Sequence, residues 1–465
     1  MENVADYIHG LATRARAAAA LLVQRTTDEK NAALKKVADA LEAHRAAIGA
    51  ANANDVAKAK AAGLADAMVD RLTLTDARFK AMVNGVRTVA ALPDPVGETI
   101  WTRERPSGIS IRKVRVPFGV VAVVFESRPN VFVDTAALCL KTGNAVILRG
   151  GKEALETNRE LARAVREGLK HSGQPLRQER RECREGQEAF ACAAQPVSPK
   201  SLATLASPAS PNDLSDAVQF VDITDHAAVT ELVRAVGLVD VAIPRGGERL
   251  IRAMCEAALV PVLKHYKGVC HVYVDDKADL GMALAILDNA KTQRPGVCNA
   301  AECLLVHERL APLFLPMVRA WAEDKGVVLH VEKWKGGKVE KCEGEVEKGE
   351  EEGEIDWERE FLALEMNVGI VKDVRGAIEH INKYGSHHSD CIVTNDAARA
   401  QEFLRDVDSA CVYHNVSTRF TDGGEFGMGA EIGISTDKLH ARGPMGLEEL
   451  TTYKYQVTGD GVIRK

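Results

Sequence analysis

Hydrophobic and polar residues change their spacing about a hundred residues into the chain. Up to residue 95, Ala and Leu recur every three or four positions, as in LATRARAAAALLV and NAALKKVADALEAHRAAIGA, which predicts helices. From residue 101 the pattern alternates, and ISIRKVRV predicts a strand pair with Gly108 at its turn. The chain therefore begins with a helical segment and continues into strands.

Short apolar runs rich in Val follow this strand pair. GVVAVVF (119–125) is too short for a solitary helix and is typical of a strand buried on both faces of a parallel sheet. Further strands are predicted at 144–151, 218–223, 239–247 and 270–276 and in CLLVHE and DCIVTND, and the intervening helices at 134–141, 153–169 and 226–236 and in LGMALAILDNAKT and AARAQEFLRDV. Alternating strands and helices predict a doubly wound α/β fold.

Two segments do not follow this alternation. Residues 174–213 begin rich in Arg and end in Pro, Ser and Ala without any period, which predicts an inserted and largely disordered surface segment. Residues 335–354 consist mainly of Gly, Glu and Lys and predict a solvated, charged loop.

Composition narrows the class of protein. A chain of 465 residues with 46% hydrophobic residues is long enough for two or three domains at roughly 150 residues each. A formal charge of −6 argues against a nucleic-acid partner, and without a signal peptide or a long apolar stretch we expect no membrane span and a cytoplasmic location. Ten cysteines without a CxxC pair favour neither a disulfide framework nor a metal site.

The most suggestive cysteine is Cys298, in KTQRPGVCNA (291–300). A lone cysteine is most often a small buried apolar group. Here, however, the neighbours form a polar loop after a Pro-Gly turn, and Arg294 would favour a thiolate, the form needed for nucleophilic attack. Cys303, in the strand CLLVHE, is expected to be buried instead.

A second polar cluster, ESRPN (126–130), follows the first buried strand, and ligands of parallel sheets bind beyond the carboxyl ends of strands. Asn130 could donate its amide to a developing oxyanion, or Asn130 or Asp134 could cap a helix. The adjacent His387 and His388 should point in opposite directions, so we do not expect them to share a metal ion.

Glycine pairs also follow strands. None of them forms GxGxxG, so the ordinary dinucleotide fingerprint is absent. Two carry a preceding arginine, which suits a phosphorylated ligand because glycine lets backbone N–H groups approach and arginine binds phosphate with two donors. The three loops are Arg149-Gly150-Gly151, Arg245-Gly246-Gly247 and Asp422-Gly423-Gly424.

Several longer strings carry a resemblance to a known family. They are VPFGVVAVVFESRPNVFVDTAALCLKTGNAVILRGG, VDVAIPRGGERLI, GVCHVYVDDKADLGMALAILDNAKTQRPGVCNA, INKYGSHHSDCIVTND and STRFTDGGEFGMGAEIGISTDKLHARGPMGLEELTTYKY. With them the chain resembles the γ-glutamyl phosphate reductases (glutamate-5-semialdehyde dehydrogenases) of the aldehyde dehydrogenase superfamily. The resemblance covers 116–455 apart from the two irregular segments.

This resemblance implies a fold with a Rossmann-type cofactor domain, an α/β catalytic domain and a small β element for oligomerisation. The NADPH-binding domain would comprise 1–100 and 120–268, the catalytic domain 269–436, and the oligomerisation element 101–119 and 437–465.

The resemblance also implies roles for individual residues. Cys298 would displace phosphate from L-glutamyl 5-phosphate to form a thioester, and Asn130 would stabilise the oxyanion together with the Cys298 N–H. The cofactor NADPH would meet Arg149, Gly150 and Gly151 at its adenosine ribose and 2′-phosphate, Gly246 and Gly247 at its pyrophosphate or nicotinamide, and Glu360 at its nicotinamide ribose. Arg294 and Arg419 would bind the carboxylate or phosphate of the substrate.

The implied activity is NADPH-dependent reduction of L-glutamyl 5-phosphate to L-glutamate 5-semialdehyde, the second step of proline synthesis from glutamate. We expect a homo-oligomer, and transfer of the substrate from glutamate 5-kinase is conceivable. The alternatives are a hydrolytic aldehyde dehydrogenase and an inactive structural relative. His265 stands near the place of the hydrolytic enzymes' general-base glutamate, and 260–274 holds no acidic residue. We interpret His265 as a surface histidine, so phosphate and not water should attack the thioester.

Overall fold

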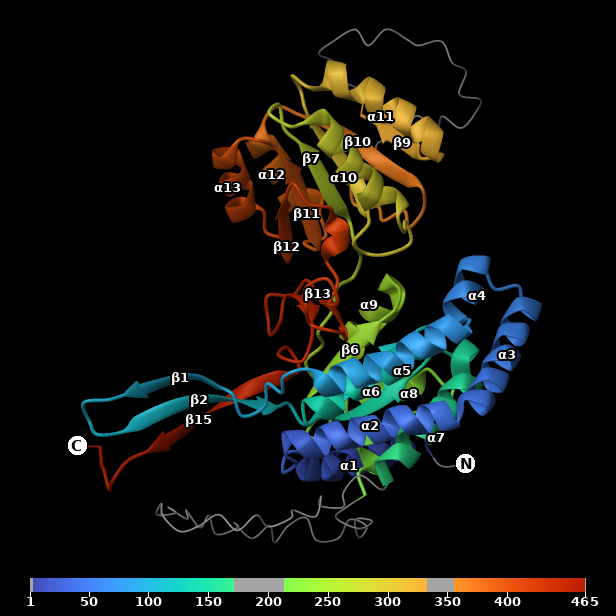
Figure 1. The fold of residues 1–465 in the computed structure, drawn as a ribbon, viewed down its shortest axis with the longest axis vertical. Coiled ribbons are helices and arrows are strands. Elements are labelled where there is room, and N and C mark those ends of the chain that lie inside the picture. Colours follow the sequence, from blue (N-terminus) through green and yellow to red (C-terminus); the bar gives the residue numbers. More distant parts are fainter. Residues whose placement is uncertain (1–2, 171–212, 333–354, 465) are drawn as a thin grey trace. The chain divides into compact units, whose positions relative to one another are not determined.

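The computed structural model describes residues 3–170, 213–332 and 355–464 (Figure 1). The segments predicted at 174–213 and 335–354 lie outside the described residues, except for residue 213 itself. The chain forms two compact units, Met1–Ala122 with Ser127–Asp240 and Thr451–Lys465, and Val123–Glu126 with Val241–Leu450. Within the described ranges, no helix combines the length and apolar character needed to cross a bilayer.

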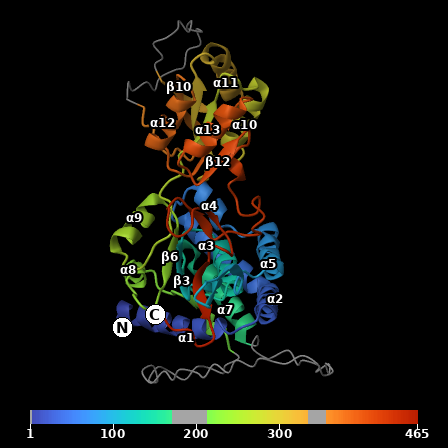
Figure 2. The same ribbon diagram turned by 90° about the vertical axis from the view of Figure 1, so that its left-hand side faces the viewer.

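The N-terminal part of the first unit is helical, as predicted. A capping box begins α2, where Thr26 Oγ1 accepts from the Glu29 N–H and the Glu29 carboxylate accepts from the Thr26 N–H. Helix α2 packs against α5 and α7, which Figure 2 shows beside it. The helices of this unit are α1 (Val4–Leu22), α2 (Thr27–Ala43), α3 (Arg45–Ala61), α4 (Asp66–Leu72), α5 (Asp76–Ala91), α6 (Pro129–Lys141), α7 (Leu155–Lys170) and α8 (Ala227–Val233).

A four-stranded sheet has the order β5-β4-β3-β6. Its strands are β3 (Val120–Phe125), β4 (Ala145–Arg149), β5 (Val218–Phe220) and β6 (Val241–Arg245). Every residue of β3 and β4 is buried, as expected for strands covered on both faces. All four strands lie within the predicted ranges.

A separate antiparallel sheet joins β1 (Thr99–Glu104), β2 (Ser110–Pro117) and β15 (Thr451–Thr458) in the order β1-β2-β15. Gly108 lies in the turn between β1 and β2 with φ 88°, a conformation that favours glycine. The whole of β15 pairs with β2. The segments that the sequence assigns to oligomerisation therefore pair with each other, while their role in association stays a prediction.

The second unit contains a six-stranded parallel sheet in the order β12-β11-β7-β8-β10-β9. Its strands are β7 (Cys270–Val274), β8 (Ala301–His307), β9 (Val328–Val331), β10 (Glu365–Val371), β11 (Ser389–Val393) and β12 (Cys411–His414). The helices beside it are α10 (Leu280–Thr292), α11 (Ala311–Lys325), α12 (Val374–Tyr384) and α13 (Ala397–Asp406), whereas α9 (Glu248–Ala257) contacts β6. The second unit also contains a separate two-stranded antiparallel sheet, β13 (Gly433–Ser435) and β14 (Gly443–Met445).

The two faces of this sheet pack against different helices. Val272 and Leu304 belong to a core with α10 and α11, whereas their neighbours Tyr273 and Leu305 belong to a core with α12 and α13 (Figure 1). This alternation follows from the two-residue period of a strand. Cys303 lies on the α12 side, fully buried as predicted.

The boundary between the two units falls after Asp240. The resemblance places the end of the NADPH-binding domain at 268. In the structure, however, residues 241–268 belong to the compact unit that also contains the six-stranded sheet. Which segments bind the cofactor stays a prediction.

Candidate active site

Cys298 lies in the loop that joins α10 to β8 and is half-buried. Asp279 begins α10 by accepting from the Met282 N–H at 2.8 Å. The segment before β7 runs so close to this loop that a Cβ added at Gly268 would lie 1.9 Å from the carbonyl oxygen of Cys298. Glycine at 268 is therefore what allows the two segments to meet.

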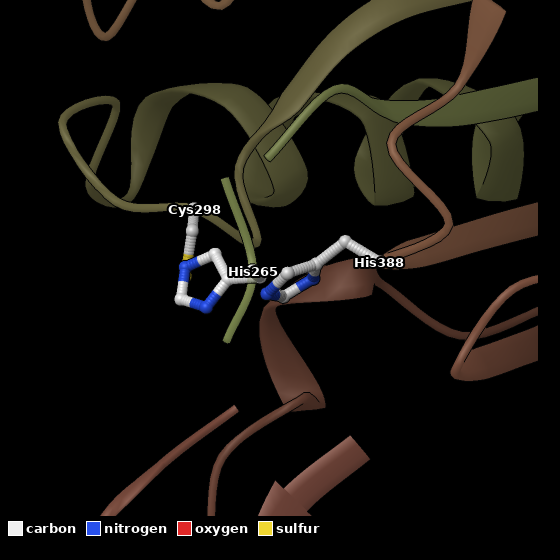
Figure 3. Close-up of side chains that lie close together, drawn as sticks. All are labelled: His265, Cys298 and His388. Carbon is white, nitrogen blue, oxygen red and sulfur yellow. The ribbon is translucent and has the colours of Figure 1, made fainter. Parts of the chain in front are cut away.

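Two histidines converge on Cys298 (Figure 3). The sulfur of Cys298 and one ring nitrogen each of His265 and His388 lie within 4.8 Å of one another. The two imidazoles meet edge to face, with ring centroids 5.4 Å apart. The sequence-based interpretation of His265 as a surface histidine is therefore wrong.

His265 lies between α9 and β7, in a segment that is held in place by the residues directly after β13. The Thr436 N–H donates to the carbonyl of Lys264 at 3.1 Å, and Lys264 pairs with the Asp437 carboxylate at 3.1 Å. Nδ1 of His265 is 2.8 Å from the carbonyl oxygen of Ile434, so it carries the proton and donates it there. Nε2 is thereby left to face the cysteine.

His388 is fully buried at the start of β11. Its Nδ1 lies 2.8 Å from Ser389 Oγ, which is 2.6 Å from Thr421 Oγ1, and Thr421 Oγ1 is in turn 2.7 Å from the Tyr413 hydroxyl. The neighbouring His387 instead places Nδ1 at 2.5 Å from the carbonyl of Asp408. The adjacent histidines diverge, as predicted.

The electrostatics of this cluster favour a thiolate. Burial alone would raise the pKa of the Cys298 thiol, but the charge of His388 and the hydrogen bond with His265 outweigh it and hold that pKa well below its usual range. Burial lowers the pKa of His265, yet its hydrogen bond to Cys298 and the thiolate charge leave it raised. A thiolate beside imidazolium is the reactive form of a cysteine nucleophile.

Glu360 lies close to the same cluster. Its Oε1 accepts from the Gly268 N–H at 2.9 Å, and it precedes β10. Burial raises the pKa of its carboxyl, and the negative charge of Cys298 adds to the rise. The sequence assigned Glu360 to the cofactor; the structure brings it to the segment that contacts Cys298.

Two arginines bring positive charge near Cys298. Arg419 is half-buried; its Nε donates to Gln293 Oε1 at 2.9 Å and its Nη1 to Asn299 Oδ1. Burial and the neighbouring charge of Arg294 lower the pKa of Arg419, while the Cys298 thiolate opposes this. These two guanidinium groups form a positively charged edge to which an anionic substrate group can bind.

Gly246 and Gly247 lie between β6 and α9, and Gly247 is the N-cap of that helix. Oε2 of Glu126 accepts from the Gly247 N–H at 3.0 Å, and a Cβ at Gly246 would collide with the same carboxylate. Nothing lies within 4 Å of a Cβ added at Gly247. In this structure the Glu126 carboxylate thus occupies the loop's backbone donor, and the role of Gly246 and Gly247 in cofactor binding stays a prediction.

The remaining predicted residues belong to the first unit. Arg149 ends β4, is buried, and donates from Nη2 to the Thr224 carbonyl at 3.3 Å. Gly150 and Gly151 follow it, and a Cβ at Gly151 would meet the Glu153 carboxylate. As at β6, these glycines connect a strand to the start of a helix, and their role in binding the cofactor stays a prediction.

Asn130 occupies the first turn of α6, exposed, with Nδ2 donating to Asp134 Oδ2 at 3.0 Å. The N-cap of α6 is Arg128, without a side-chain capping bond. The structural alternative of Asn130 or Asp134 as the N-cap is therefore wrong. An exposed amide near a strand's carboxyl end is compatible with the oxyanion role, which stays a prediction.

Known structures define the class of protein. The structure matches that of an acetylating aldehyde dehydrogenase from Geobacillus thermoglucosidasius with a TM-score of 0.64 at 15% identity, covering 100% of this chain and 99% of that one. It matches a probable aldehyde dehydrogenase from Listeria monocytogenes with a TM-score of 0.64 at 14% identity, covering 99% and 98%. The chain thus has the aldehyde dehydrogenase fold, with a cysteine beside a pair of imidazoles.

Nearer relatives define the family. The sequence is 47% identical to a γ-glutamyl phosphate reductase from Moorella thermoacetica over 465 residues, 100% of both chains. It is 41% identical to the γ-glutamyl phosphate reductase from Thermotoga maritima, whose crystal structure matches with a TM-score of 0.85 over 98% of this chain and 100% of that one. No protein-family model matches the sequence. The chain belongs to the γ-glutamyl phosphate reductases.

Proposed function

We propose that this protein reduces L-glutamyl 5-phosphate to L-glutamate 5-semialdehyde with NADPH, releasing phosphate. One observation carries the chemistry: Cys298, half-buried between His265 and His388, has a pKa held well below that of an ordinary thiol. Full-length identity of 47% to a γ-glutamyl phosphate reductase supports the choice of substrate.

In the first step Cys298 Sγ attacks the acyl carbon, the bond from that carbon to the phosphate oxygen breaks, and phosphate leaves with the electron pair. The product is a thioester on Cys298. Asn130 and the Cys298 N–H would donate to the oxyanion that forms during this attack. Arg294 and Arg419 would hold the carboxylate or phosphate of the substrate.

Bound NADPH supplies a hydride to the thioester carbon. We assign Arg149, Gly150 and Gly151 to the adenosine ribose and 2′-phosphate, Gly246 and Gly247 to the pyrophosphate or nicotinamide, and Glu360 to the nicotinamide ribose. The resulting thiohemiacetal collapses by breaking its carbon–sulfur bond. His265 and His388 would then receive Cys298 back as a thiolate stabilised by their positive charge.

A hydrolytic aldehyde dehydrogenase is the alternative, which membership of the γ-glutamyl phosphate reductases does not favour. His265, which lies beside Cys298 and not on the surface, is the residue that could serve it. An imidazole at this position could activate water against the thioester. The two candidates differ in what releases the acyl group, phosphate in the reductase and water in the hydrolytic enzyme.

The deciding experiment runs the reaction backwards on the purified full chain, with NADP⁺ and pyrroline carboxylate, which is in equilibrium with the semialdehyde. We expect NADP⁺ reduction only when phosphate or arsenate is added. Steady reduction without either, lost in His265→Ala, would establish the hydrolytic enzyme instead. No reduction under any condition would indicate the inactive relative.

The preference for NADPH has its own test. Arg149→Ala should weaken NADPH binding about tenfold more than NADH binding, because only NADPH offers a 2′-phosphate to the guanidinium. Arg159→Ala, which removes an exposed arginine paired with Asp222 on the same unit, is the matched control. Equal losses for the two cofactors in Arg149→Ala would assign Arg149 a purely structural role.

We further propose association into a homo-oligomer through the sheet β1-β2-β15, whose strand β15 exposes Tyr453, Tyr455 and Val457. Tyr455→Glu should then reduce the molecular mass in solution, measured by light scattering. An unchanged mass would place the interface elsewhere. A cytoplasmic location and receipt of substrate from glutamate 5-kinase are further parts of the proposal.

A further inference from the structure

The cluster of Cys298, His265 and His388 has a second capacity besides nucleophilic attack. One sulfur and two ring nitrogens lie within 4.8 Å of one another. Zinc bonds of about 2.0–2.3 Å to nitrogen and sulfur place tetrahedral ligands roughly 3.5 Å apart, so a small inward movement brings all three donors onto one ion.

Contacts behind the two imidazoles fix which nitrogen each presents. Nδ1 of His265 donates to the Ile434 carbonyl, and Nδ1 of His388 faces Ser389 Oγ. His388 is 0% exposed, and its Nε2 has no hydrogen-bond partner among the described residues. Such contacts on the distal nitrogen are what orient histidine ligands in metal sites. Nε2 of His388 thus faces the cluster and can bind an ion together with Cys298 (Figure 3); Nε2 of His271 and of His380, beside Cys303, is also buried without a hydrogen-bond partner in the described part of the chain, so access to solvent is what distinguishes the two clusters.

The donor set selects the kind of ion. One cysteine sulfur and two imidazole nitrogens suit Zn²⁺ and Cd²⁺, whereas Mg²⁺ and Ca²⁺ prefer oxygen ligands. Three protein ligands leave a fourth position for water or an anion. We propose that Cys298, His265 and His388 form an inhibitory site for Zn²⁺ or Cd²⁺. Binding forms a metal–sulfur bond to the Cys298 thiolate and a metal–nitrogen bond to each imidazole, and an imidazole that is protonated beforehand loses that proton to solvent; the sulfur can then no longer attack a substrate.

Two other clusters in the described residues serve as comparisons. His271, Cys303 and His380 also lie within 4.8 Å, but Cys303 and His271 are completely buried, which leaves an ion no open coordination position toward solvent. Asp275 and Asp276 lie near His307, but Arg399 already pairs with both carboxylates. The Cys303 cluster therefore supplies the matched control for the Cys298 cluster.

The test titrates Cd²⁺ into the chelator-treated full chain and follows the ultraviolet absorbance of the metal–thiolate bond. We expect one ion per chain, no such absorbance in Cys298→Ser, and at least tenfold weaker binding in His388→Gln, with unchanged binding in Cys303→Ser. Thermal unfolding of each variant checks that it is folded. Absorbance that survives in Cys298→Ser, or disappears in Cys303→Ser, would overturn the proposal.

The inhibitory part of the inference rests on the proposed function, whereas the absorbance does not. Zn²⁺ should abolish NADP⁺ reduction with pyrroline carboxylate and phosphate, and a chelator should restore it. Ion binding without inhibition would contradict the inhibitory site. An untreated enzyme that shows no turnover would contradict the proposed function, while the absorbance would still report on the metal site.

Discussion

Two cysteines five residues apart have opposite surroundings in this protein. Cys298 lies half-buried in the loop between α10 and β8, beside the side chains of His265 and His388. Its pKa is held well below that of an ordinary thiol. Cys303 lies in β8, fully buried, and burial raises its pKa well above the usual range. The local sequence separates a polar loop from an apolar strand, and the neighbours that the fold brings in then set the acidity of each thiol.

Removing the two sulfurs in turn should give the largest contrast. Cys298→Ser should lower kcat by about a thousandfold or more, because a hydroxyl is a far weaker acid and nucleophile than a thiol. Cys303→Ser should keep activity within about threefold while lowering stability, since it places a hydroxyl in the core. Assays at matched folded fractions measure both. Substantial turnover in Cys298→Ser would show that Cys298 is not the nucleophile.

A buried ion pair joins the two elements that flank the loop of Cys298, and its contribution to stability can be measured. Lys291 ends α10, Glu302 is in β8, and Lys291 Nζ lies 2.7 Å from Glu302 Oε2, with both residues fully buried. Lys291→Met should lower the free energy of unfolding by about 3 kcal/mol, because it leaves Glu302 without its partner. The double variant Lys291→Met/Glu302→Leu should recover most of this loss in denaturant unfolding.

The same pair has a defined pH dependence. Burial raises the pKa of Glu302 to about 7. A carboxyl with a folded pKa above its unfolded value favours the folded state at low pH and loses that contribution as the pH rises through the folded pKa. Lys291→Met should therefore regain stability when the pH falls from 8 to 6. Equal instability at both pH values would show that Glu302 is not the cause.

The histidines should account for the difference in acidity between the two thiols. His388→Gln removes the positive charge that favours the Cys298 thiolate, so activity at pH 6.5 should fall by about 10- to 100-fold and recover in part at alkaline pH. The matched control is His387→Gln, the adjacent histidine that bonds to Asp408 instead. A uniform loss at all pH values would assign His388 a structural role.

Cys270→Ala should have only a small effect on activity. It is fully buried, with its pKa raised well above the usual range by burial, yet its Sγ donates to the carbonyl of Cys298 at 3.2 Å. Cys270→Ala should lower kcat by about two- to fivefold through slight displacement of the loop. A loss as large as that of Cys298→Ser would make Cys270 a second reactive thiol.

Local pattern was sufficient for most of the fold. The Val-rich runs predicted β3 and β4, and the polar, Gly-containing context singled out Cys298 from ten cysteines. The sequence predicts that the adjacent histidines in GSHHSD point in opposite directions, but it does not indicate that His388 is the one that turns toward Cys298.

The groups that activate Cys298 could not be predicted in this way. His265 and His388 lie in segments distant in sequence, and they reach the cysteine through Gly268 and through the parallel order of β7, β8 and β11. No spacing rule within the sequence encodes such a meeting. A polar context can indicate a reactive residue, whereas its partners become visible only in the fold.

The central claim is that the fold makes Cys298 the reactive thiol, and the most direct measurement is the rate of alkylation of each cysteine between pH 5 and pH 9, followed by mass spectrometry of peptides. The account predicts that Cys298 reacts first and stays reactive well below pH 8.5, near which an ordinary thiol titrates, while Cys303 stays unmodified until the chain unfolds. Earlier modification of Cys303, or a Cys298 rate that rises only near pH 8.5, would contradict it.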